Sequence, residues 1–306
     1  MLVNFISNDL HLSASYLTEL AKTSSHRYKQ YAIPKRRGGQ RLIHQPSAQI
    51  KLLQYWLVQN LFSYLPIHSA ASAYMPSCSI LKHALRHAEN NFLLKIDFTD
   101  FFHSIHKSDI ARILKANEGK LRGLIKTEED IRLTCAIVCR HDCIVIGAPS
   151  SPILSNAVMF EFDEYWTQWS VANQVTYSRY ADDLCFSTNK PGILANLLQL
   201  LRQDLNKRDS PKLFINDAKT VFTSRKKKRL VTGLVLTSRS QISLGRKKKR
   251  EIRALLDRFR WNTLPKEKAR YLSGYISFVR SVEPSFLTSL ETKYGTELLS
   301  KVLHSK

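Results

Sequence analysis

The sequence predicts an α+β protein in which an antiparallel sheet is backed by helices. Two short strand patterns, residues 175–180 and 184–187, flank a turn with two adjacent aspartates, which indicates a β-hairpin. A third apolar strand runs into Asp97. Much of the remaining chain repeats apolar residues every three or four positions, as amphipathic helices do. These patterns together define the fold class.

The other elements follow from local signals. Residues 1–31 are expected to be helical with Ser13 as an N-cap, and Gly38-Gly39 between two short strands predicts a hairpin. Ser79 is the expected cap of a short helix. Helices are further expected over residues 45–64, 79–87, 107–145 in large part, 147–160, 192–206 and from 245 onward, and a strand over 230–235.

The charge balance indicates a polyanionic partner. The chain of 306 residues has 47 basic and 25 acidic side chains, a net charge of +22. Residues 219–270 alone contain 18 basic and 3 acidic residues, so this segment supplies 18 − 3 = +15. Such a concentrated positive charge points to nucleic acid rather than to a merely soluble basic protein.

The apolar segments and the cysteines of the sequence bear on cellular location. We see no signal-peptide pattern and no apolar run long enough to cross a bilayer, so no membrane partner is expected. The five cysteines, an odd number, favour reduced thiols. Both observations favour the cytoplasm.

Three aspartates form the candidate catalytic centre. Consecutive strand residues point to opposite faces, so Asp182 and Asp183 reach one site best from the turn itself. Their apolar flanks indicate burial, and buried carboxylates need protons or cations. With Asp97 they would suit a two-metal phosphoryl-transfer site, whose ions lie roughly 3.5–4 Å apart. Taken alone, the Asp-Asp pair is more typical of a solvated hairpin turn.

Other polar residues leave two interpretations open. Lys35 and Arg41 flank the Gly-Gly turn and suit either a triphosphate or a solvated basic turn. Histidines 83 and 87 are one helical turn apart, which suits either a metal or satisfied helix histidines. Cysteines 135, 139 and 143 lie near His141 and could bind zinc or be buried free thiols. Free thiols are favoured, because the sequence lacks the paired Cys-x₂₋₄-Cys motifs of structural zinc sites.

The motifs resemble the reverse transcriptase family. Tyr180-Ala181-Asp182-Asp183, preceded by an aspartate strand ending in Phe101-Phe102, looks like the palm of those enzymes. Val231-Thr232-Gly233 and Pro149-Ser150-Ser151-Pro152 resemble retron motifs in particular. His83-Ala84-Leu85-Arg86-His87 matches a retron motif in part, with His83 in place of asparagine.

The resemblance implies a right-hand polymerase: an antiparallel-sheet palm, mostly helical fingers and a short basic helical thumb. The expected boundaries are fingers 1–93, palm 94–106, a fingers insertion 107–148, palm 149–238 and thumb 239–306.

The resemblance also implies roles for individual residues. Asp97, Asp182 and Asp183 would hold two Mg²⁺ ions and carry out catalysis. Phe102 would select deoxynucleotides by a clash with a ribose hydroxyl, although one of Phe101 and Phe102 is expected in the core. The residues implied to bind the deoxynucleotide are Lys35, Arg41, Phe98, Phe102, Pro149, Ser150 and Lys219, the last being otherwise a surface lysine. Those implied to bind RNA or primer are Val231, Thr232, Gly233, Arg246, Lys247, Lys248, Lys249, Arg250 and Arg253.

The implied function is reverse transcription of a cognate retron noncoding RNA. The product would be branched msDNA primed from a guanosine 2′-hydroxyl, with an effector protein as partner in anti-phage defence. Two alternatives stay open. One is another bacterial reverse-transcriptase-like polymerase, either group II intron-like or protein-primed. The other is a non-catalytic RNA-binding scaffold that restrains a toxin. The three acids argue against a scaffold, because buried carboxylates destabilise a protein that does not need them.

Overall fold

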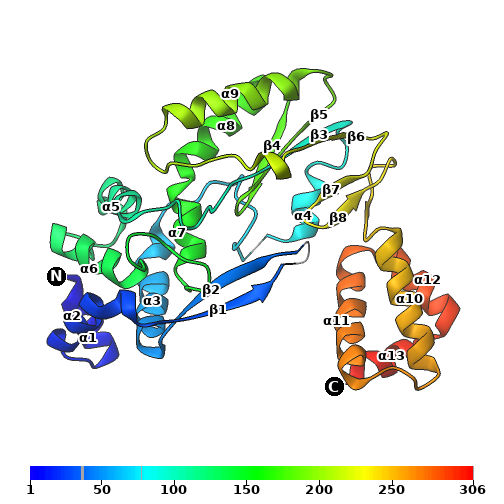
Figure 1. Cartoon of the computed structure of the whole chain (residues 1–306), viewed down its shortest axis with the longest axis horizontal. Helices are drawn as coiled ribbons and strands as arrows, with labels where there is room; N and C mark the ends of the chain where they lie inside the picture. The colour runs from blue at the N-terminus through cyan, green and yellow to red at the C-terminus, as the bar shows by residue number, and fades with distance from the viewer. Residues whose placement is uncertain (36–37, 77, 306) are drawn as a thin grey trace. The chain divides into compact units, whose positions relative to one another are not determined.

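The computed structural model describes residues 1–35, 38–76 and 78–305, so residues 36–37, 77 and 306 lie outside it. The chain folds into two compact units (Figure 1). The first comprises residues 1–76, 95–186 and 192–221, and the second comprises 77–94, 187–191 and 222–306. Strands β3 (Phe92–Asp97) and β5 (Asp183–Thr188) run from one into the other.

The first unit contains most of the helices that precede the acidic hairpin. Its elements are α1 (Leu2–Leu10), α2 (Ala14–Thr23), β1 (Tyr28–Pro34), β2 (Gln40–Pro46), α3 (Ala48–Asn60), α5 (Lys107–Ala116), α6 (Glu128–Val138), α7 (Ser151–Val158), α8 (Phe160–Ala172), β4 (Thr176–Tyr180) and α9 (Ile193–Lys207). The predicted N-cap at Ser13 is confirmed, because its side chain accepts a hydrogen bond from the Tyr16 amide.

The expected helix over residues 1–31 is wrong at its end. The helices stop by His26, and β1 begins at Tyr28, which pairs with Pro46 in an antiparallel register with β2. The Gly38-Gly39 hairpin is thereby confirmed and is longer than predicted. Long-range pairing with β2 overrides the local pattern of these residues.

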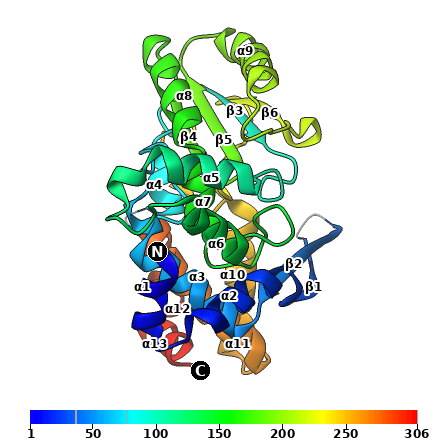
Figure 2. The same ribbon diagram turned by 90° about the vertical axis from the view of Figure 1, so that its left-hand side faces the viewer.

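Strands from both halves of the sequence form a four-stranded sheet in the order β4-β5-β3-β6, with β6 spanning Val221–Ser224. Helix α8 packs on the β4–β5 hairpin: the Trp166 and Phe186 ring centroids are 5.9 Å apart, and Tyr177 stacks on Phe186 at 4.7 Å. The Trp166 indole donates to Asp204 of α9 at 3.0 Å, which joins the two helices above the hairpin (Figure 2). The predicted α+β class is confirmed.

The second unit consists of α4 (Ile80–Leu85), a small sheet and a helical bundle. The sheet has the order β7-β8-β9, with β9 spanning Ile242–Ser243, and the bundle contains α10 (Arg246–Arg260), α11 (Lys266–Val282), α12 (Pro284–Tyr294) and α13 (Thr296–His304). The single strand expected over 230–235 is wrong. β7 (Arg229–Val231) and β8 (Leu234–Leu236) form a hairpin whose turn residues, Thr232 and Gly233, have φ of 46° and 85°.

The described part of the chain contains no helix that is both long and apolar enough to span a membrane.

The loop that precedes α7 lies directly against β2. The His44 amide donates to the Ile146 carbonyl at 2.8 Å, and Gly147 has a φ of 110°. A Cβ at Gly147 would lie 2.8 Å from the His44 carbonyl oxygen and 2.9 Å from Ile43 Cγ2. A glycine is therefore required here by both conformation and space.

We predict that Gly147→Ala lowers the free energy of unfolding by about 2 kcal/mol or more, because a backbone atom must move and the φ is unfavourable. Urea unfolding monitored by tryptophan fluorescence measures the change. Gly119→Ala is the control, since a Cβ there meets no atom within 4 Å, and its effect should stay within about 0.5 kcal/mol. Equal effects of the two substitutions would contradict the prediction.

Candidate active site

The acidic turn, defined as Ala181, Asp182 and Asp183, joins β4 to β5. Ala181 has a φ of 55°, in the left-handed region that non-glycine residues rarely occupy. Asp183 is the first residue of β5, so the two carboxylates sit where the chain leaves the turn. The predicted hairpin with its acids at the turn is thus present.

Asp97 ends β3, the strand that lies beside β5 in the sheet. The amide of Phe98 donates to the Asp182 carbonyl at 3.1 Å, which ties the two segments together by their backbones. The Asn216 amide donates to the Asp97 carbonyl at 2.8 Å and brings the segment with Lys219 to the same place. The sheet therefore gathers residues that lie 85 or more positions apart in the sequence, as 182 − 97 = 85 shows.

The three carboxylates influence one another electrostatically. Burial, and then the charges of Asp183 and Asp97, raise the pKa of Asp182 to about 6. Burial also raises the pKa of Asp183, an effect that Lys95 opposes and Asp97 reinforces. Like charges in a partly desolvated place favour the protonated forms unless cations compensate them.

Two lysines provide part of that compensation. Lys219 Nζ lies 2.7 Å from Asp97 Oδ1, and Lys95 Nζ lies 3.7 Å from Asp183 Oδ2. Among the residues that the structure describes, the three carboxylates do not bring one oxygen each within 4.8 Å of the others. A single ion would contact all three only after their side chains rotate. The donor set, three carboxylates of which Asp182 and Asp183 have a raised pKa, is nevertheless that of a hard divalent cation site.

The residues implied to bind the nucleotide lie in different environments. Lys35 and Arg41 are exposed on the β1–β2 hairpin. Phe98 is 2% exposed, with ring centroids 6.0 Å from both Phe101 and Phe162, so its side chain contributes packing. Of the two adjacent phenylalanines, Phe101 is buried and Phe102 is half-buried, which answers the question that the sequence left open.

Pro149 and Ser150 lie in the loop that leads into α7. Pro149 is half-buried and Ser150 is fully buried, and the Ser150 hydroxyl has no hydrogen-bond partner among the described atoms. Its side chain therefore does not lie open to a ligand in this structure. Of these two residues, Pro149 alone presents surface to a ligand.

In the second unit, the basic residues of α10 divide into two groups. Arg246, Lys247 and Arg250 are exposed. Lys248, Lys249 and Arg253 are half-buried and turn toward the helical bundle. Lys248 lies 2.8 Å from Glu251 and 4.3 Å from the Tyr275 ring centroid, and Lys249 lies 2.5 Å from Glu283. Arg253 lies over the Phe286 ring at 5.0 Å, so half of the implied RNA-binding cluster has partners within its own bundle.

The Val231-Thr232-Gly233 segment is a turn rather than a strand interior. The Val231 side chain is fully buried, whereas Gly233 is exposed and Thr232 is half-buried with its hydroxyl 3.4 Å from the Ile80 carbonyl. Only the turn residues can therefore face a ligand.

Burial favours free thiols for the cysteines, whereas both alternatives stay open for the histidines. His83 and His87 are buried, and His87 Nδ1 lies 2.7 Å from the Ser187 hydroxyl. Burial lowers the pKa of His87 well below its usual value. Cys135 and Cys139 are buried free thiols, and burial raises the pKa of Cys135 to about 11. The expectation of buried free thiols is confirmed for Cys135 and Cys139.

Sequence reasoning missed two features beside the acids. Lys95 lies two residues before Asp97 on the same strand face, and that alternation was a usable signal. The second feature is a buried ion pair between Arg179 and Asp163, which precedes the acidic turn. Nothing local in the sequence pairs these residues, because they lie 16 positions apart on different elements.

Comparisons with known proteins agree with this geometry. The family model described as reverse transcriptase (RNA-dependent DNA polymerase) matches residues 33–272. Two proteins of Escherichia coli are each 35% identical: the retron Ec83 reverse transcriptase, over 90% of this chain and 89% of its own length, and the retron Ec73 reverse transcriptase, over 88% of each.

A solved structure confirms the right-hand fold. The telomerase of Candida albicans, in complex with a TWJ fragment of telomeric RNA, superposes with a TM-score of 0.50 at 14% identity. The match covers 96% of this chain and 59% of the telomerase chain, so this chain spans about three-fifths of the telomerase length.

The raised pKa of Asp182 predicts a pH-dependent stability in the presence of a chelator. Because folding raises the pKa of Asp182, the protonated carboxyl group favours the folded state. This contribution to stability is complete below the pKa of the unfolded chain and is lost as pH rises through the pKa of the folded state, about 6. Relative to Asp182→Asn, the wild type should therefore lose on the order of 2 kcal/mol of unfolding free energy between pH 4 and pH 7.

Urea unfolding at several pH values in EDTA measures this difference. Asp209→Asn, at an exposed position of the same unit, serves as the control and should show no such trend. A constant difference between wild type and Asp182→Asn across this range would contradict the prediction.

Proposed function

The chain belongs to the retron reverse transcriptases, which are RNA-directed DNA polymerases, and on that basis we propose that it copies a cognate retron noncoding RNA into branched msDNA. Synthesis would start from a guanosine 2′-hydroxyl of that RNA. The observation that carries the proposal is the meeting of Asp97, at the end of β3, with the acidic turn within a chain of this family.

The family generally uses divalent metal ions. We propose that Asp97, Asp182 and Asp183 hold two Mg²⁺, which when bound lower the pKa of the attacking hydroxyl and neutralise charge on the triphosphate. The raised pKa of Asp182 supports this assignment, because these carboxylates would gain a cation in place of a proton. Lys219, which now lies against Asp97, would be released to the leaving phosphates when the ions bind.

The nucleotide would be oriented by residues of the first unit. Lys35 and Arg41 are exposed and would contact the triphosphate, one as a compact charge and the other as a planar fork. Phe102, half-buried beside the buried Phe101, would lie under the sugar and exclude a ribose. Pro149, half-buried in the loop before α7, would form the floor of this site.

RNA would be bound by the exposed residues of α10, with Arg246, Lys247 and Arg250 contacting phosphates. The Thr232-Gly233 turn would lie near the primer end. The deoxynucleotides, the noncoding RNA and the msDNA product are the proposed ligands, and an effector protein of an anti-phage system is the proposed protein partner in the cytoplasm. Sequencing of nucleic acid that co-purifies with the protein tests the identity of the RNA.

We predict that Asp182→Asn combined with Asp183→Asn abolishes DNA synthesis, by at least about 1,000-fold, because the cation site is lost. Primer extension on an RNA template annealed to a DNA primer measures activity, and fluorescence anisotropy with the same duplex measures binding, which should change less than about threefold. Asp142→Asn combined with Asp209→Asn removes two exposed charges of the same unit and should leave both unchanged. Retained synthesis in the first variant would refute the assignment.

Neutralising Arg246, Lys247 and Arg250 to glutamine should weaken RNA binding and flatten its salt dependence. A phosphate contact that is lost releases no counterion on binding. Each substitution therefore lowers the magnitude of the slope of log K against log salt by about 0.7–0.9, and the three together lower it by about 2–3. Anisotropy titrations at several salt concentrations provide the slopes. The same charge change at Lys22, Lys120 and Lys126, exposed in the other unit, is the control. If both triple variants keep the wild-type slope, α10 does not bind the RNA.

A further inference from the structure

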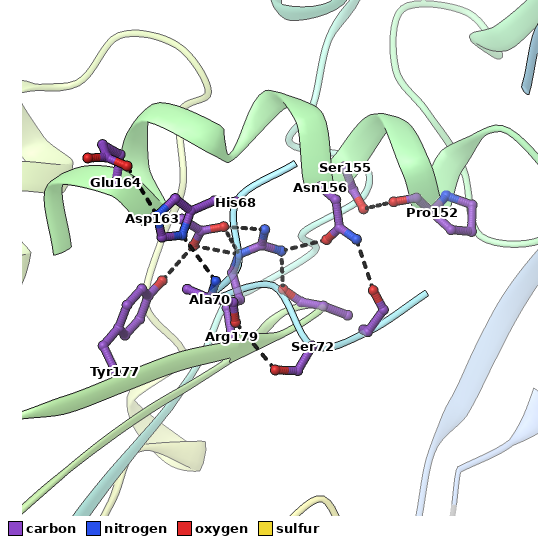
Figure 3. A network of polar contacts seen from close by, with 12 residues as sticks. His68, Ala70, Ser72, Pro152, Ser155, Asn156, Asp163, Glu164, Tyr177 and Arg179 are labelled. Carbon is purple, nitrogen blue, oxygen red and sulfur yellow. Dashed lines mark hydrogen bonds and ion pairs between the residues drawn. The ribbon is translucent and has the colours of Figure 1, made fainter. Parts of the chain in front are cut away.

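We propose that Arg179, held by Asp163, is a positioning residue that fixes the backbone of the acidic turn. The inference rests on the proposed function, because it gives a role to the turn that carries two of the three proposed metal ligands. It concerns side chains that do not face the reacting groups and that form a buried polar network behind them (Figure 3).

The pair itself is fully enclosed. Both side chains are 0% exposed, and the guanidinium meets the carboxylate with two parallel contacts: Nε to Oδ1 at 2.9 Å and Nη2 to Oδ2 at 2.6 Å. The Tyr177 hydroxyl donates to Asp163 Oδ1 at 2.7 Å. The carboxylate is thus saturated with donors, as a buried charge must be.

The remaining end of the guanidinium reaches the turn. Arg179 Nη1 donates to the carbonyl oxygen of Ala181 at 3.1 Å and to Asn156 Oδ1 at the same distance. Ala181 is the residue with a φ of 55°, and it immediately precedes Asp182. A left-handed conformation is unfavourable for alanine, so a bond that fixes the orientation of its carbonyl also fixes where the next two side chains start.

The main chain of Arg179 is anchored as firmly as its side chain. Its amide donates to the Ala70 carbonyl at 2.9 Å, and its carbonyl accepts from the Ser72 amide at 2.7 Å. Asn156 is itself held, because its Nδ2 donates to the Ala73 carbonyl at 2.9 Å. Through its main chain and its guanidinium, Arg179 therefore joins the segment 70–73, α7 and α8 to one carbonyl of the acidic turn (Figure 3).

Stability alone does not account for this arrangement. Well-packed apolar residues commonly replace a buried ion pair without loss of stability, because both charges must be desolvated. What an apolar pair cannot do is donate to the Ala181 carbonyl while remaining rigidly oriented. The fork of an arginine, locked on one side by a carboxylate, can do both.

The test compares two variants that disturb the same carboxylate. Arg179→Lys keeps the positive charge beside Asp163, but one ammonium group cannot span the carboxylate, the amide of Asn156 and the Ala181 carbonyl. Tyr177→Phe removes a hydrogen bond to Asp163 and leaves the link to Ala181 intact. Three quantities are measured for each: the thermal midpoint, kcat for primer extension, and hydrogen exchange of the 180–184 amides in EDTA.

For Arg179→Lys we expect kcat to fall at least tenfold and the amides of the acidic turn to exchange at least tenfold faster. For Tyr177→Phe we expect a lower thermal midpoint, with kcat and turn exchange within about twofold of wild type. A purely structural role would instead make activity follow the thermal midpoint in both variants. That outcome, or unchanged kcat and exchange in Arg179→Lys, overturns the proposal.

A neutral pair covers the case in which Arg179→Lys does not fold. Arg179→Gln with Asp163→Asn retains hydrogen bonding without a buried charge, and the shorter glutamine does not reach Ala181. It should fold, with the same loss of kcat and of turn protection, and wild-type values of both would overturn the proposal. If the wild-type protein makes no DNA, the proposed function is refuted. The hydrogen-exchange comparison is made without metal, so it still tests whether Arg179 fixes the acidic turn.

Discussion

Repulsion among three carboxylates is the constraint on which the candidate site depends. Burial and mutual charge both favour protonation, and they raise the pKa of Asp182 to about 6. The acids stay together because β3 and β5 are hydrogen-bonded neighbours and because α8 packs its Trp166 against the Phe186 of the hairpin. The free energy that holds like charges in one place therefore comes from aromatic packing and backbone pairing elsewhere in the sheet.

Sequence reasoning was sufficient for features that are specified locally. The acidic hairpin needs only alternating strand residues around a turn, and the caps at Ser13 and Ser79 need only a hydroxyl ahead of a helical pattern. The convergence of Asp97 with the turn was predicted from chemistry, since isolated buried acids are costly. These elements depend on neighbours in the sequence or on a requirement that residue types alone express.

Features that depend on distant partners could not be predicted in this way. Whether Phe101 or Phe102 is buried depends on where Phe98 and Phe162 lie, not on the motif. Residues 28–31 form a strand because β2 pairs with them, and Thr232 forms a turn because both flanking strands pair with each other. The Arg179–Asp163 pair joins a strand to a helix, and each residue taken alone resembles an ordinary surface charge.

The basic residues show why net charge does not identify a binding surface. Arg179 and Arg229 are both buried, and Arg229 donates to backbone carbonyls that include that of Thr237 at 2.7 Å, so neither contributes to an external field as a free cation. Half of the implied cluster on α10 is likewise committed to its own bundle. On that helix the exposed Arg246, Lys247 and Arg250 remain available to a polyanion, and such lysines and arginines recognise phosphate without regard to base.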